Sequence, residues 1–547
     1  MECVARMQGT LLKGIKNIAF SPDGSHLVAS AFDDDHSIAI YKWNAVLKPG
    51  ETLKPVASGK GTRANILSIG FNPTATEVIA TCVKEVCFFT FAGGLLKCKK
   101  GTGWPANTAQ AVMCQAYVGQ TLYTGLFDGS IASWNGSAIK GTMKAHTEGC
   151  HALYPRQNGL ISGGGDGLII FWQAGPAGLT QTNQFDLKLP EIKSMMPKVR
   201  SVCENTTTGM VLVGTRGGEI VEFGGPKPLV HIRGHFEGEL WGLATHPQRA
   251  EFITVGQDNV LAIWDIATRK QKRFGKLEQG GNVAALSNNG QLLAIGYING
   301  AVHVLQPDNK FAMKANKKDR VKAISDIKFN PNDTLMAVAA HDSLIILYDV
   351  VQNFKPLRKM RGHPSTVAHM DFSLDGKTIM SNCTSYNILF FDTTSGKHMP
   401  SGASMFKDET WASWTCTLGW PVQGIFPPFA DGSDINACDR SPDSTIIATA
   451  DDFGTVKLFK YPSPVEKASY NQYIGHSSHV TNARFVKSSP YLITTGGEDK
   501  CIFQWKYFID KESQRQSAQV ASAAAVQDLS NIADDIYTPP PPKPVAA

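Results

Sequence analysis

Short stretches in which hydrophobic and polar residues alternate recur along the chain. They come in pairs around tight turns, as in IKNIAFSPDGSHLVAS, ISDIKFNPNDTLMAVAA and VAHMDFSLDGKTIMS. Alternation with a period of two predicts half-buried strands, and the Pro, Asp, Asn and Gly between them predict hairpins. Eleven such units lie between residues 14 and 507. Repeats of roughly 40 to 45 residues predict the four-stranded blades of WD-type β-propellers.

Four of the units also share a polar and aromatic pattern. In each, an Asp lies six residues before a Trp, a Ser or Thr lies four residues before that Asp, and three of the four have a His further upstream. We predict that these residues form a buried hydrogen-bond chain, because buried polar groups are tolerated only when they are paired. A catalytic Ser, His and Asp set is the alternative, but a nucleophile has no reason to recur in several blades beside a Trp. No catalytic residue is therefore predicted. The four sets are Thr124, Asp128 and Trp134; His146, Ser162, Asp166 and Trp172; His235, Thr254, Asp258 and Trp264; and His476, Thr495, Asp499 and Trp505.

Eleven blades are too many for one ring, since known propellers hold roughly four to eight. The sequence therefore predicts an all-β protein with two tandem propellers, joined at the charged stretch RKQKRFGKLEQGG, residues 269–281. Residues 397–428 lack the usual turn and Asp, and we expect a degenerate twelfth blade there, which gives about six blades to each ring. The expected division is an N-terminal segment at 1–13, a first propeller at 14–272, a second propeller at 273–509 and a tail at 510–547.

The tail is Ala-rich and then Pro-rich. A short helix is expected around Gln519 to Ile532, and the final TPPPPKPVAA favours extended polyproline structure that cannot join a sheet. We expect this tail to be disordered or docked on a partner.

Composition narrows the classes of function. The chain has 42% hydrophobic and 18% charged residues and no apolar run near the ~18 to 20 residues of a membrane helix. The N-terminus has no long apolar region typical of a secretory signal. A net charge of +6 is mild for this length. It argues against nucleic-acid binding but suits association with an acidic surface. We expect a cytoplasmic protein without a membrane or nucleic-acid partner.

Candidate metal and cofactor motifs are weak. The eleven cysteines are scattered, and the close pair Cys82 and Cys87 has no second pair to complete a zinc site. The GGGDG at residues 163–167 is followed by a strand, not by the helix that phosphate loops use. We expect the thiols to be reduced and the GGGDG to be a blade turn. We expect no bound metal and no cofactor.

Basic clusters are the candidate partner-binding residues. We expect both clusters to lie in loops between blades, where a partner can reach them; ordinary solvated loops are the alternative. Four Trp residues, Trp241, Trp411, Trp414 and Trp420, fit either an interface or the core, and core packing is favoured. The basic clusters are Lys97, Lys99 and Lys100, and Lys314, Lys317, Lys318, Arg320 and Lys322.

Several segments carry a family resemblance. RGHFEGELWGLATHP, NPNDTLMAVAAHDSLIILYDV, GHPSTVAHMDFSLDGKTIMSN, WASWTCTLGWPVQGIFPPFADGSDINA and ATADDFGTVKLFKYP resemble the echinoderm microtubule-associated protein-like family, over about residues 14–507. The resemblance implies a non-enzymatic tandem propeller that binds tubulin or the microtubule wall. It also implies a place in the cytoskeleton, often in the axoneme of a cilium, with other axonemal or cytoskeletal proteins as partners.

The chain also departs from the family pattern. The basic coiled-coil region of some members and a first blade ahead of residue 14 are not recognisable. An unclosed first ring would expose strand edges. A closing strand in VARMQGTLL and a covering partner protein are the two alternatives.

Two other functions stay open at this point. An actin-filament-associated protein also joins two WD rings in one chain, and WD adaptors serve ubiquitin-ligase and signalling complexes. Sedimentation with microtubules or with F-actin distinguishes a microtubule-associated protein from an actin-associated one.

Overall fold

The computed structural model describes residues 13–43, 52–104, 110–176, 178–426 and 433–508, together with Met7, Leu11 and Asp431. These residues form eleven antiparallel sheets and two short helices, α1 (Gly402–Met405) and the 3-10 helix η1 (Trp420–Ile425). The chain divides into two compact units, Met1–Arg233 and Gly234–Ala547, here called unit 1 and unit 2. The prediction of an all-β tandem propeller is confirmed. The expected tail helix and polyproline segment, and most of VARMQGTLL, lie outside the described residues.

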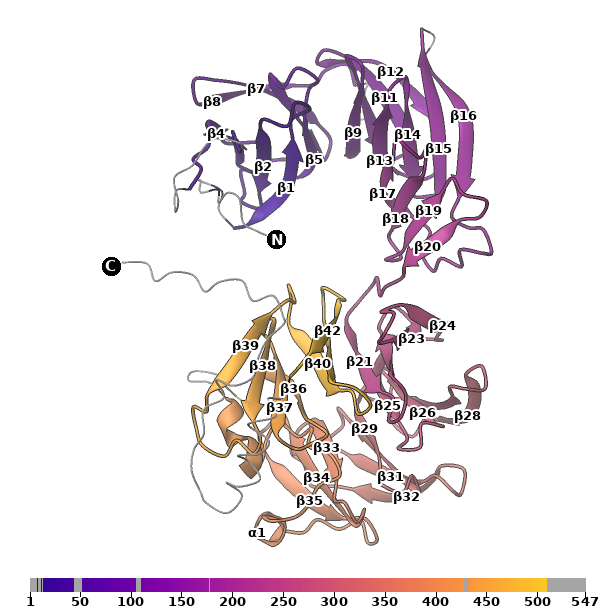
Figure 1. Cartoon of the computed structure of the whole chain (residues 1–547), viewed down its shortest axis with the longest axis vertical. Coiled ribbons are helices and arrows are strands. Elements are labelled where there is room, and N and C mark those ends of the chain that lie inside the picture. The colour runs from indigo at the N-terminus through magenta and orange to yellow at the C-terminus, as the bar shows by residue number, and fades with distance from the viewer. Residues whose placement is uncertain are drawn as a thin grey trace, which may run out of the picture. The chain divides into compact units, whose positions relative to one another are not determined.

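Unit 1 contains five blades, each a four-stranded sheet (Figure 1). In every blade the chain runs from the innermost strand outward, and neighbouring strands are antiparallel. The blades are β1 (Ile15–Phe20), β2 (Leu27–Ala31), β3 (Ile38–Tyr41) and β4 (Ala57–Gly59); β5 (Ile66–Phe71), β6 (Glu77–Cys82), β7 (Val86–Ala92) and β8 (Leu95–Lys100); β9 (Val112–Val118), β10 (Thr121–Leu126), β11 (Ser130–Asn135) and β12 (Ala138–Lys144); β13 (Cys150–Arg156), β14 (Gly159–Gly164), β15 (Leu168–Gly175) and β16 (Gly178–Asp186); and β17 (Val199–Glu204), β18 (Val211–Thr215), β19 (Ile220–Phe223) and β20 (Leu229–Ile232).

The five blades form an open arc. Inner strands β1, β5, β9, β13 and β17 follow one another, each in contact with the next. Among the described residues no comparable contact joins β17 back to β1, and Figure 1 shows the opening between β1 and β20.

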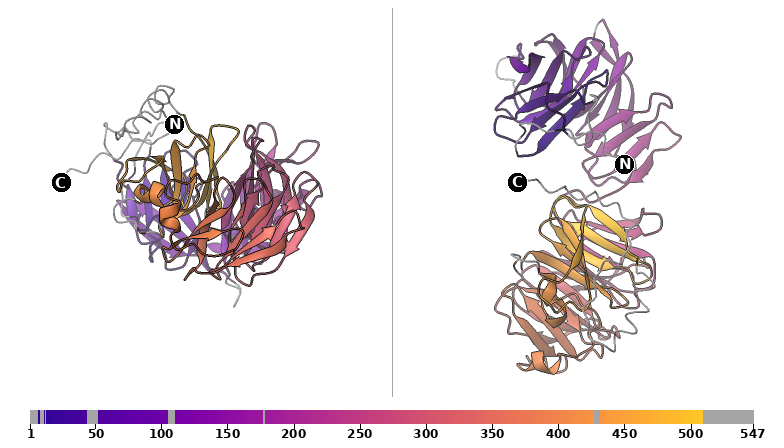
Figure 2. Two further views of the ribbon diagram at one scale, coloured as in Figure 1. Left: turned by 90° about the horizontal axis from the view of Figure 1, so that it is seen from below. Right: turned by 60° about the vertical axis from the view of Figure 1, so that its left-hand side comes forward.

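Unit 2 contains six sheets. The sheets follow one another around the unit in Figures 1 and 2. They are β21 (Leu240–Thr245), β22 (Glu251–Gly256), β23 (Val260–Asp265) and β24 (Gln271–Lys276); β25 (Gly281–Leu286), β26 (Leu293–Tyr297), β27 (Val302–Gln306) and β28 (Ala312–Lys317); β29 (Ile324–Phe329), β30 (Leu335–Ala340), β31 (Ile345–Asp349) and β32 (Lys355–Met360); β33 (Val367–Phe372), β34 (Thr378–Cys383) and β35 (Ile388–Asp392); β36 (Ile435–Arg440), β37 (Ile446–Asp451), β38 (Thr455–Lys460) and β39 (Tyr470–Ile474); and β40 (Val480–Phe485), β41 (Tyr491–Gly496) and β42 (Ile502–Lys506).

Unit 2 closes into a ring. Its first inner strand, β21, contacts both β25 and the last inner strand, β40. Between β33 and β36 the irregular segment 411–417 takes the place of a sheet: Trp411 forms a bridge to Ser373, and the backbone N–H groups of Thr415 and Cys416 donate to Asp371. This is the degenerate blade expected at 397–428, so unit 2 has seven blade positions.

The unit boundary differs from the expected one. The structure places it between Arg233 and Gly234, not between residues 272 and 273. The charged stretch 269–281 is the outer strand β24 and its connection to β25, and outer strands are charged because they face solvent. The blade at 240–276 therefore belongs to unit 2. The division is five blades and seven positions instead of six and six.

A recurrent turn joins the first two strands of many blades. Its first residue is Ser or Asn, whose side-chain oxygen accepts the backbone N–H five residues later, and its fourth residue has positive φ, which suits Gly, Asn or Asp. Gly24 and Gly290 show this conformation, with φ of 68° and 73°. Local chemistry thus fixes each hairpin. The bonds run from His26 to Ser21, Leu292 to Ser287, Leu335 to Asn330, Thr378 to Ser373 and Ile446 to Ser441, at 2.8 to 3.0 Å.

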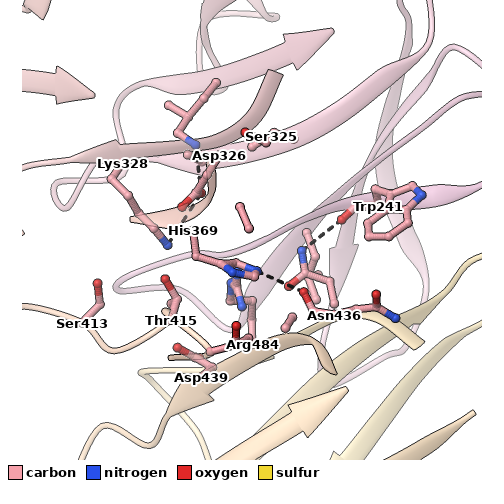
Figure 3. A pocket seen from close by; sticks show the side chains of 18 of the residues that line it. Trp241, Ser325, Asp326, Lys328, His369, Ser413, Thr415, Asn436, Asp439 and Arg484 are labelled. Atoms are coloured by element: carbon pink, nitrogen blue, oxygen red, sulfur yellow. Dashed lines mark hydrogen bonds and ion pairs between the residues drawn. The ribbon is translucent and has the colours of Figure 1, made fainter. Parts of the chain in front are cut away.

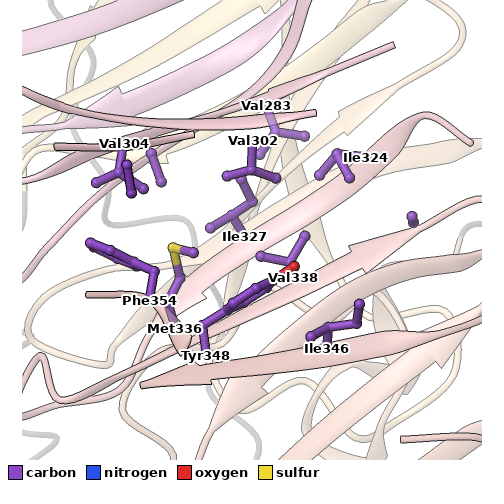
Figure 4. Packing of buried hydrophobic residues seen from close by; sticks show 13 residues of the cluster. Val283, Val302, Val304, Ile324, Ile327, Met336, Val338, Ile346, Tyr348 and Phe354 are labelled. Atoms are coloured by element: carbon purple, nitrogen blue, oxygen red, sulfur yellow. The ribbon is translucent and has the colours of Figure 1, made fainter. Parts of the chain in front are cut away.

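Hydrophobic clusters lie between neighbouring blades. Figure 4 shows one of them, in which Val302 and Val304 of β27 meet Ile327 of β29 and Tyr348 of β31. Tyr348 and Phe354 are 1% and 0% exposed. Full burial of such a side chain stabilises the fold by about 1.5 to 3 kcal/mol. Each blade therefore depends on the next one for much of its stability.

Candidate functional site

The predicted hydrogen-bond chain is present in the blade of β13 to β16. The indole of Trp172 donates to Ser162 Oγ at 2.8 Å, and Ser162 Oγ lies 2.8 Å from His146 Nε2. His146 Nδ1 lies 3.0 Å from Asp166. The Asp166 carboxylate only accepts, so His146 donates to it from Nδ1, and the Ser162 hydroxyl, which accepts from the indole, has its own proton free to donate to Nε2. Burial opposes ionisation of Asp166, but hydrogen bonds from His146 and Thr147 outweigh it and lower its pKa to about 2.

The blade of β21 to β24 repeats this arrangement. Trp264 donates to Thr254 at 2.7 Å, Thr254 lies 2.9 Å from His235 Nε2, and His235 Nδ1 lies 2.9 Å from Asp258. The two hydroxyls, Ser162 and Thr254, have no exposed surface. They cannot meet a substrate.

The third hydrogen-bond chain contains Thr494, so the prediction of Thr495 is wrong by one residue. Trp505 donates to Thr494 at 2.8 Å, and Thr494 lies 2.9 Å from His476 Nε2. His476 Nδ1 completes the chain at 3.2 Å from Asp499. The turn between β41 and β42 holds one residue more than that between β14 and β15. Because strand side chains alternate between faces, Thr495 points the other way and contacts Thr481 at 2.9 Å.

The fourth set is incomplete. Trp134 donates to Thr124 at 2.9 Å. Asp128 has no His beside it within the described residues; its backbone N–H donates to Gln110 at 2.8 Å, and its carboxylate accepts from Ser130 N at 2.8 Å.

Other blades contain related pairs that the sequence pattern missed. His363 Nε2 lies 2.7 Å from the buried Ser381 hydroxyl. The Gly-His dipeptide at 362–363, shared with 234–235 and 475–476, was the available signal. This blade has Phe391 at the Trp position, and His363 Nδ1 has no partner among the described residues, so the complete pattern does not extend to it. Tyr297 contacts His303 Nδ1 at 3.0 Å in another blade.

Side chains on the inner strands of unit 2 join several blades to their neighbours. Asn282 donates to the Ile324 carbonyl at 2.9 Å, and Asn436 donates to that of Val480 at 3.0 Å. Asn482 donates to the Trp241 carbonyl at 3.0 Å and Thr481 to that of Leu240, which closes the ring. These bonds hold the inner strands at matching levels around a central cavity.

The cavity of unit 2 has a volume of about 1110 Å³ and is lined by the seven inner segments. Figure 3 shows its polar side chains, with His369 and Asn436 near one another and Trp241 beyond them. His369 Nε2 donates to the Asn436 carbonyl at 3.0 Å. The Trp241 indole donates to Glu239 at 2.6 Å.

Charged groups face one another deeper in this cavity. Lys328 Nζ lies 3.9 Å from Asp326. Burial raises the pKa of Asp326 against the opposing effect of Lys328, and burial likewise raises that of Asp439 against Arg484. Burial, with Arg484 next in effect, lowers the pKa of His369 to about 4, so the imidazole is neutral near pH 7.

The basic clusters lie mainly on outer strands, not in loops as expected. Lys97, Lys99 and Lys100 are exposed on β8, and Lys100 pairs with Glu85 at 2.6 Å. In the second cluster Lys314 and Lys317 are on β28. Lys318 and Lys322 follow that strand and are exposed.

The prediction of Arg320 as a partner-binding residue is wrong. It is only 3% exposed, and its guanidinium donates to Asp342 and to the Leu344 carbonyl. It fixes the connection between two blades instead of facing solvent.

The four weighed Trp residues divide between core and surface. Trp411 and Trp414 are each 4% exposed and pack in the degenerate blade, in agreement with the expected core packing. Trp420 is 50% exposed, so it is not a core residue. Trp241 is half-buried on the cavity wall.

The opening of unit 1 exposes hydrophobic side chains on both terminal blades. Leu212, Ile220, Leu229 and Ile232 share one face of β18 to β20, by their register, and are 37% to 54% exposed. On β1, Ile15, Ile18 and Phe20 are 58% to 62% exposed. Leu11 and Leu53 cover another part of the first blade, beside Tyr41. Met7, in the candidate closing segment, forms a bridge to Leu53.

The remaining candidate motifs are structural where the chain is described. The GGGDG at 163–167 contains the last two residues of β14 and the turn that leads to β15. The ten described cysteines are free, and no cluster of three metal-binding side chains occurs among the described residues. No helix in the described part of the chain is long and apolar enough to span a membrane.

Comparison with known proteins places unit 2 in a defined class. A family model described as echinoderm microtubule-associated protein second beta-propeller matches residues 240–507, and a WD domain, G-beta repeat model matches residues 1–42. The first match begins at β21, in agreement with the boundary at Gly234.

Three curated relatives extend the similarity over both units. Echinoderm microtubule-associated protein-like 4 of Xenopus laevis is 31% identical over 98% of this chain and 58% of its own length. The Homo sapiens protein of that name is 32% identical over 98% of the chain and 56% of its own length. Echinoderm microtubule-associated protein-like 2 of Rattus norvegicus is 32% identical over 91% of the chain and 76% of its own length. The chain thus spans little more than half of the first two relatives.

Proposed function

Because the chain belongs to the echinoderm microtubule-associated protein-like family, we propose that it is a microtubule-associated scaffold that binds tubulin or the microtubule wall. The observation that carries this proposal is the 32% identity to a named microtubule-associated relative over 91% of the chain, through both units. Its partners would be tubulin and other cytoskeletal proteins.

A scaffold without catalysis fits the chemistry of the blades. The Ser or Thr, His and Asp sets have the geometry of a triad, but their hydroxyls are buried and bonded to Trp indoles. Their polar groups are used to hold strands together. We therefore propose binding, not turnover, as the activity.

Exposed lysines on the outer strands supply a surface for acidic tubulin. Lys97 and Lys99 on β8, and Lys314 and Lys318 on and after β28, are all exposed. Exposed charges interact through water and are screened by salt. Binding to microtubules should therefore weaken as salt is added.

Sedimentation of the full chain with microtubules tests the proposal. We expect the chain to pellet with microtubules and to stay in the supernatant with F-actin. Recovery with F-actin alone would favour the actin-associated alternative. Recovery of ubiquitin-ligase or signalling subunits without tubulin from a cell extract would favour the adaptor alternative.

Charge reversal tests the basic surface. Lys317→Glu with Lys318→Glu should weaken microtubule binding several-fold, because two attractive charges become repulsive. Lys355→Glu with Lys359→Glu makes the same charge change on β32, the outer strand of the next blade, where both lysines are exposed, and should change binding less. Equal binding by wild type and the first variant would remove these lysines from the interface.

We further propose a ciliary location, as a component of axonemal doublet microtubules. Rigid blades with exposed outer strands suit a permanent structural component. A tagged full chain should remain with the axoneme after detergent extraction of cilia. Its absence from the axoneme, with retention on cytoplasmic microtubules, would contradict the ciliary location and leave microtubule binding in place.

A further inference from the structure

The central cavity of unit 2 has different chemistry at its two ends. All inner strands run in the same direction around it. Thr481, near the start of β40, bonds to Leu240 at the start of β21, and Asn282, near the start of β25, bonds to Ile324 at the start of β29. Every lysine and arginine among the described lining residues lies in the second half of an inner strand or beyond it. The end where the strands begin, here called the upper end, has the Glu239 carboxylate and no described cation in its lining. The lining cations are Lys328, Arg440, Arg484 and Lys487.

The upper end contains buried acceptor atoms that lack a donor. Asn382 is 2% exposed, its Nδ2 donates to Thr417 at 3.1 Å, and its Oδ1 accepts no hydrogen bond from the described residues. His369 donates through Nε2 to a carbonyl, so its Nδ1 carries a lone pair, and that atom is also buried and without a described partner. Asn482 Oδ1 is the third such atom. These three atoms have no exposed surface, so a ligand reaches them only if the side chains that cover them move.

The entrance at this end combines a carboxylate with aromatic rings. Glu239 accepts the Trp241 indole N–H at 2.6 Å, which fixes the ring beside the carboxylate. The Glu239 side chain is 32% exposed, and its Oε1 lies 3.7 Å from His479 Nε2, whose ring centroid is 6.0 Å from that of Trp241, so a bound cation would share Glu239 with His479. Tyr386, on the same rim, is 52% exposed. A carboxylate beside an indole attracts a cation through charge and through the face of the ring.

We propose that the upper end of this cavity binds the basic side chain of an arginine or lysine presented by a partner peptide. The positive group would lie at the exposed side of the Glu239 carboxylate, beside Trp241 and His479. The cations deeper in the cavity limit how far it enters. This site goes beyond microtubule association and does not depend on it.

Short peptides that differ in one side chain test the site on the full chain by calorimetry. The probes are acetylated glycine tripeptide amides with a central arginine, lysine or citrulline. Citrulline has the shape of arginine without its charge. We expect the arginine or lysine peptide to bind, with the stronger of the two identifying the preferred cation, and the citrulline peptide to bind about tenfold more weakly or less.

Matched variants locate the binding. Glu239→Gln should weaken binding of the basic peptide about tenfold, since it removes the charge and keeps the shape. Glu498→Gln makes the same change at an exposed residue outside the cavity lining and should leave binding unchanged. Circular dichroism melting curves that match wild type show that both variants fold. Equal binding of citrulline, no binding of either basic peptide, or unchanged binding to Glu239→Gln would each overturn the proposal.

Discussion

At the scale of single residues, one buried hydroxyl joins two strands and a loop in each complete hydrogen-bond chain. Thr494 accepts from Trp505 and contacts His476, and the His in turn contacts Asp499. Removing the hydroxyl leaves an indole N–H and an imidazole nitrogen buried without their partner. Such losses cost about 1 to 3 kcal/mol each.

Thr494→Val should therefore lower the free energy of unfolding by about 2 kcal/mol or more. Thr495→Val is the matched control, because the Thr481 hydroxyl beside it also contacts the Leu240 and Thr495 carbonyls and keeps partners. Urea unfolding of both variants measures the difference. An equal or larger loss for Thr495→Val would contradict the assignment of Thr494.

Histidine burial makes stability depend on pH. His363 is 7% exposed, and burial, with His398 next in effect, lowers its pKa from 6.5 to about 4. The folded protein therefore binds fewer protons than the unfolded chain between these values, and stability falls as pH drops through this range.

Between about pH 7 and about pH 5, the free energy of unfolding of the wild type should fall by about 2 kcal/mol through His363 alone. In His363→Gln this side chain cannot titrate, so the fall in the free energy of unfolding over the same range should be smaller by that amount. Urea unfolding at the two pH values measures both proteins. Parallel pH profiles would show that His363 is not buried in a neutral form.

At the scale of elements, neighbouring residues of one strand report whether a blade face is covered. On β19, Ile220 is 37% exposed and Val221 is 0% exposed. Val221 packs with Val213 and Phe223 in the cluster shared with the preceding blade. Ile220 lies on the face toward the opening of unit 1.

Val221→Ser should lower the free energy of unfolding by about 2 to 4 kcal/mol, because a buried side chain is lost and a hydroxyl is buried. Ile220→Ser should cost about 1 kcal/mol or less in the isolated protein. Thermal unfolding of the two variants gives the comparison. Similar losses in both would mean that the open face is covered in solution.

At the scale of the whole molecule, ring closure determines which segments fold together. Unit 2 closes because β40 contacts β21, with Thr481 and Asn482 bonded to the first blade of that unit. A fragment 234–508 contains every blade position of this ring. A fragment 273–508 lacks most of one blade and would expose the faces on both sides of it.

The fragment 234–508 should be monomeric and unfold in one cooperative step, whereas 273–508 should aggregate, because unpaired edges and bare apolar faces promote association. Size-exclusion chromatography and circular dichroism melting curves distinguish the two results. A stable monomer from 273–508 would contradict the boundary at Gly234.

Much of this protein could be predicted from local sequence. Alternation, turn residues and the repeat length depend on neighbouring residues, so the eleven blades and the all-β class follow from the chain alone. The spacing of Ser162, Asp166 and Trp172 was sufficient to predict their hydrogen bonds. The same rule failed at Thr495, because one extra turn residue changes the face of a strand without changing the composition of the motif.

Only the tertiary structure decided which blades share a ring and what lies at its centre. The charge of 269–281 looked like a linker because an outer strand and a linker both face solvent, and a local pattern cannot separate them. The bond from Asn482 to Trp241 joins residues 241 positions apart and has no sequence signal. The cavity with Glu239, His369 and Asn382 exists because seven inner segments converge, so its chemistry belongs to the closed ring and not to any single blade.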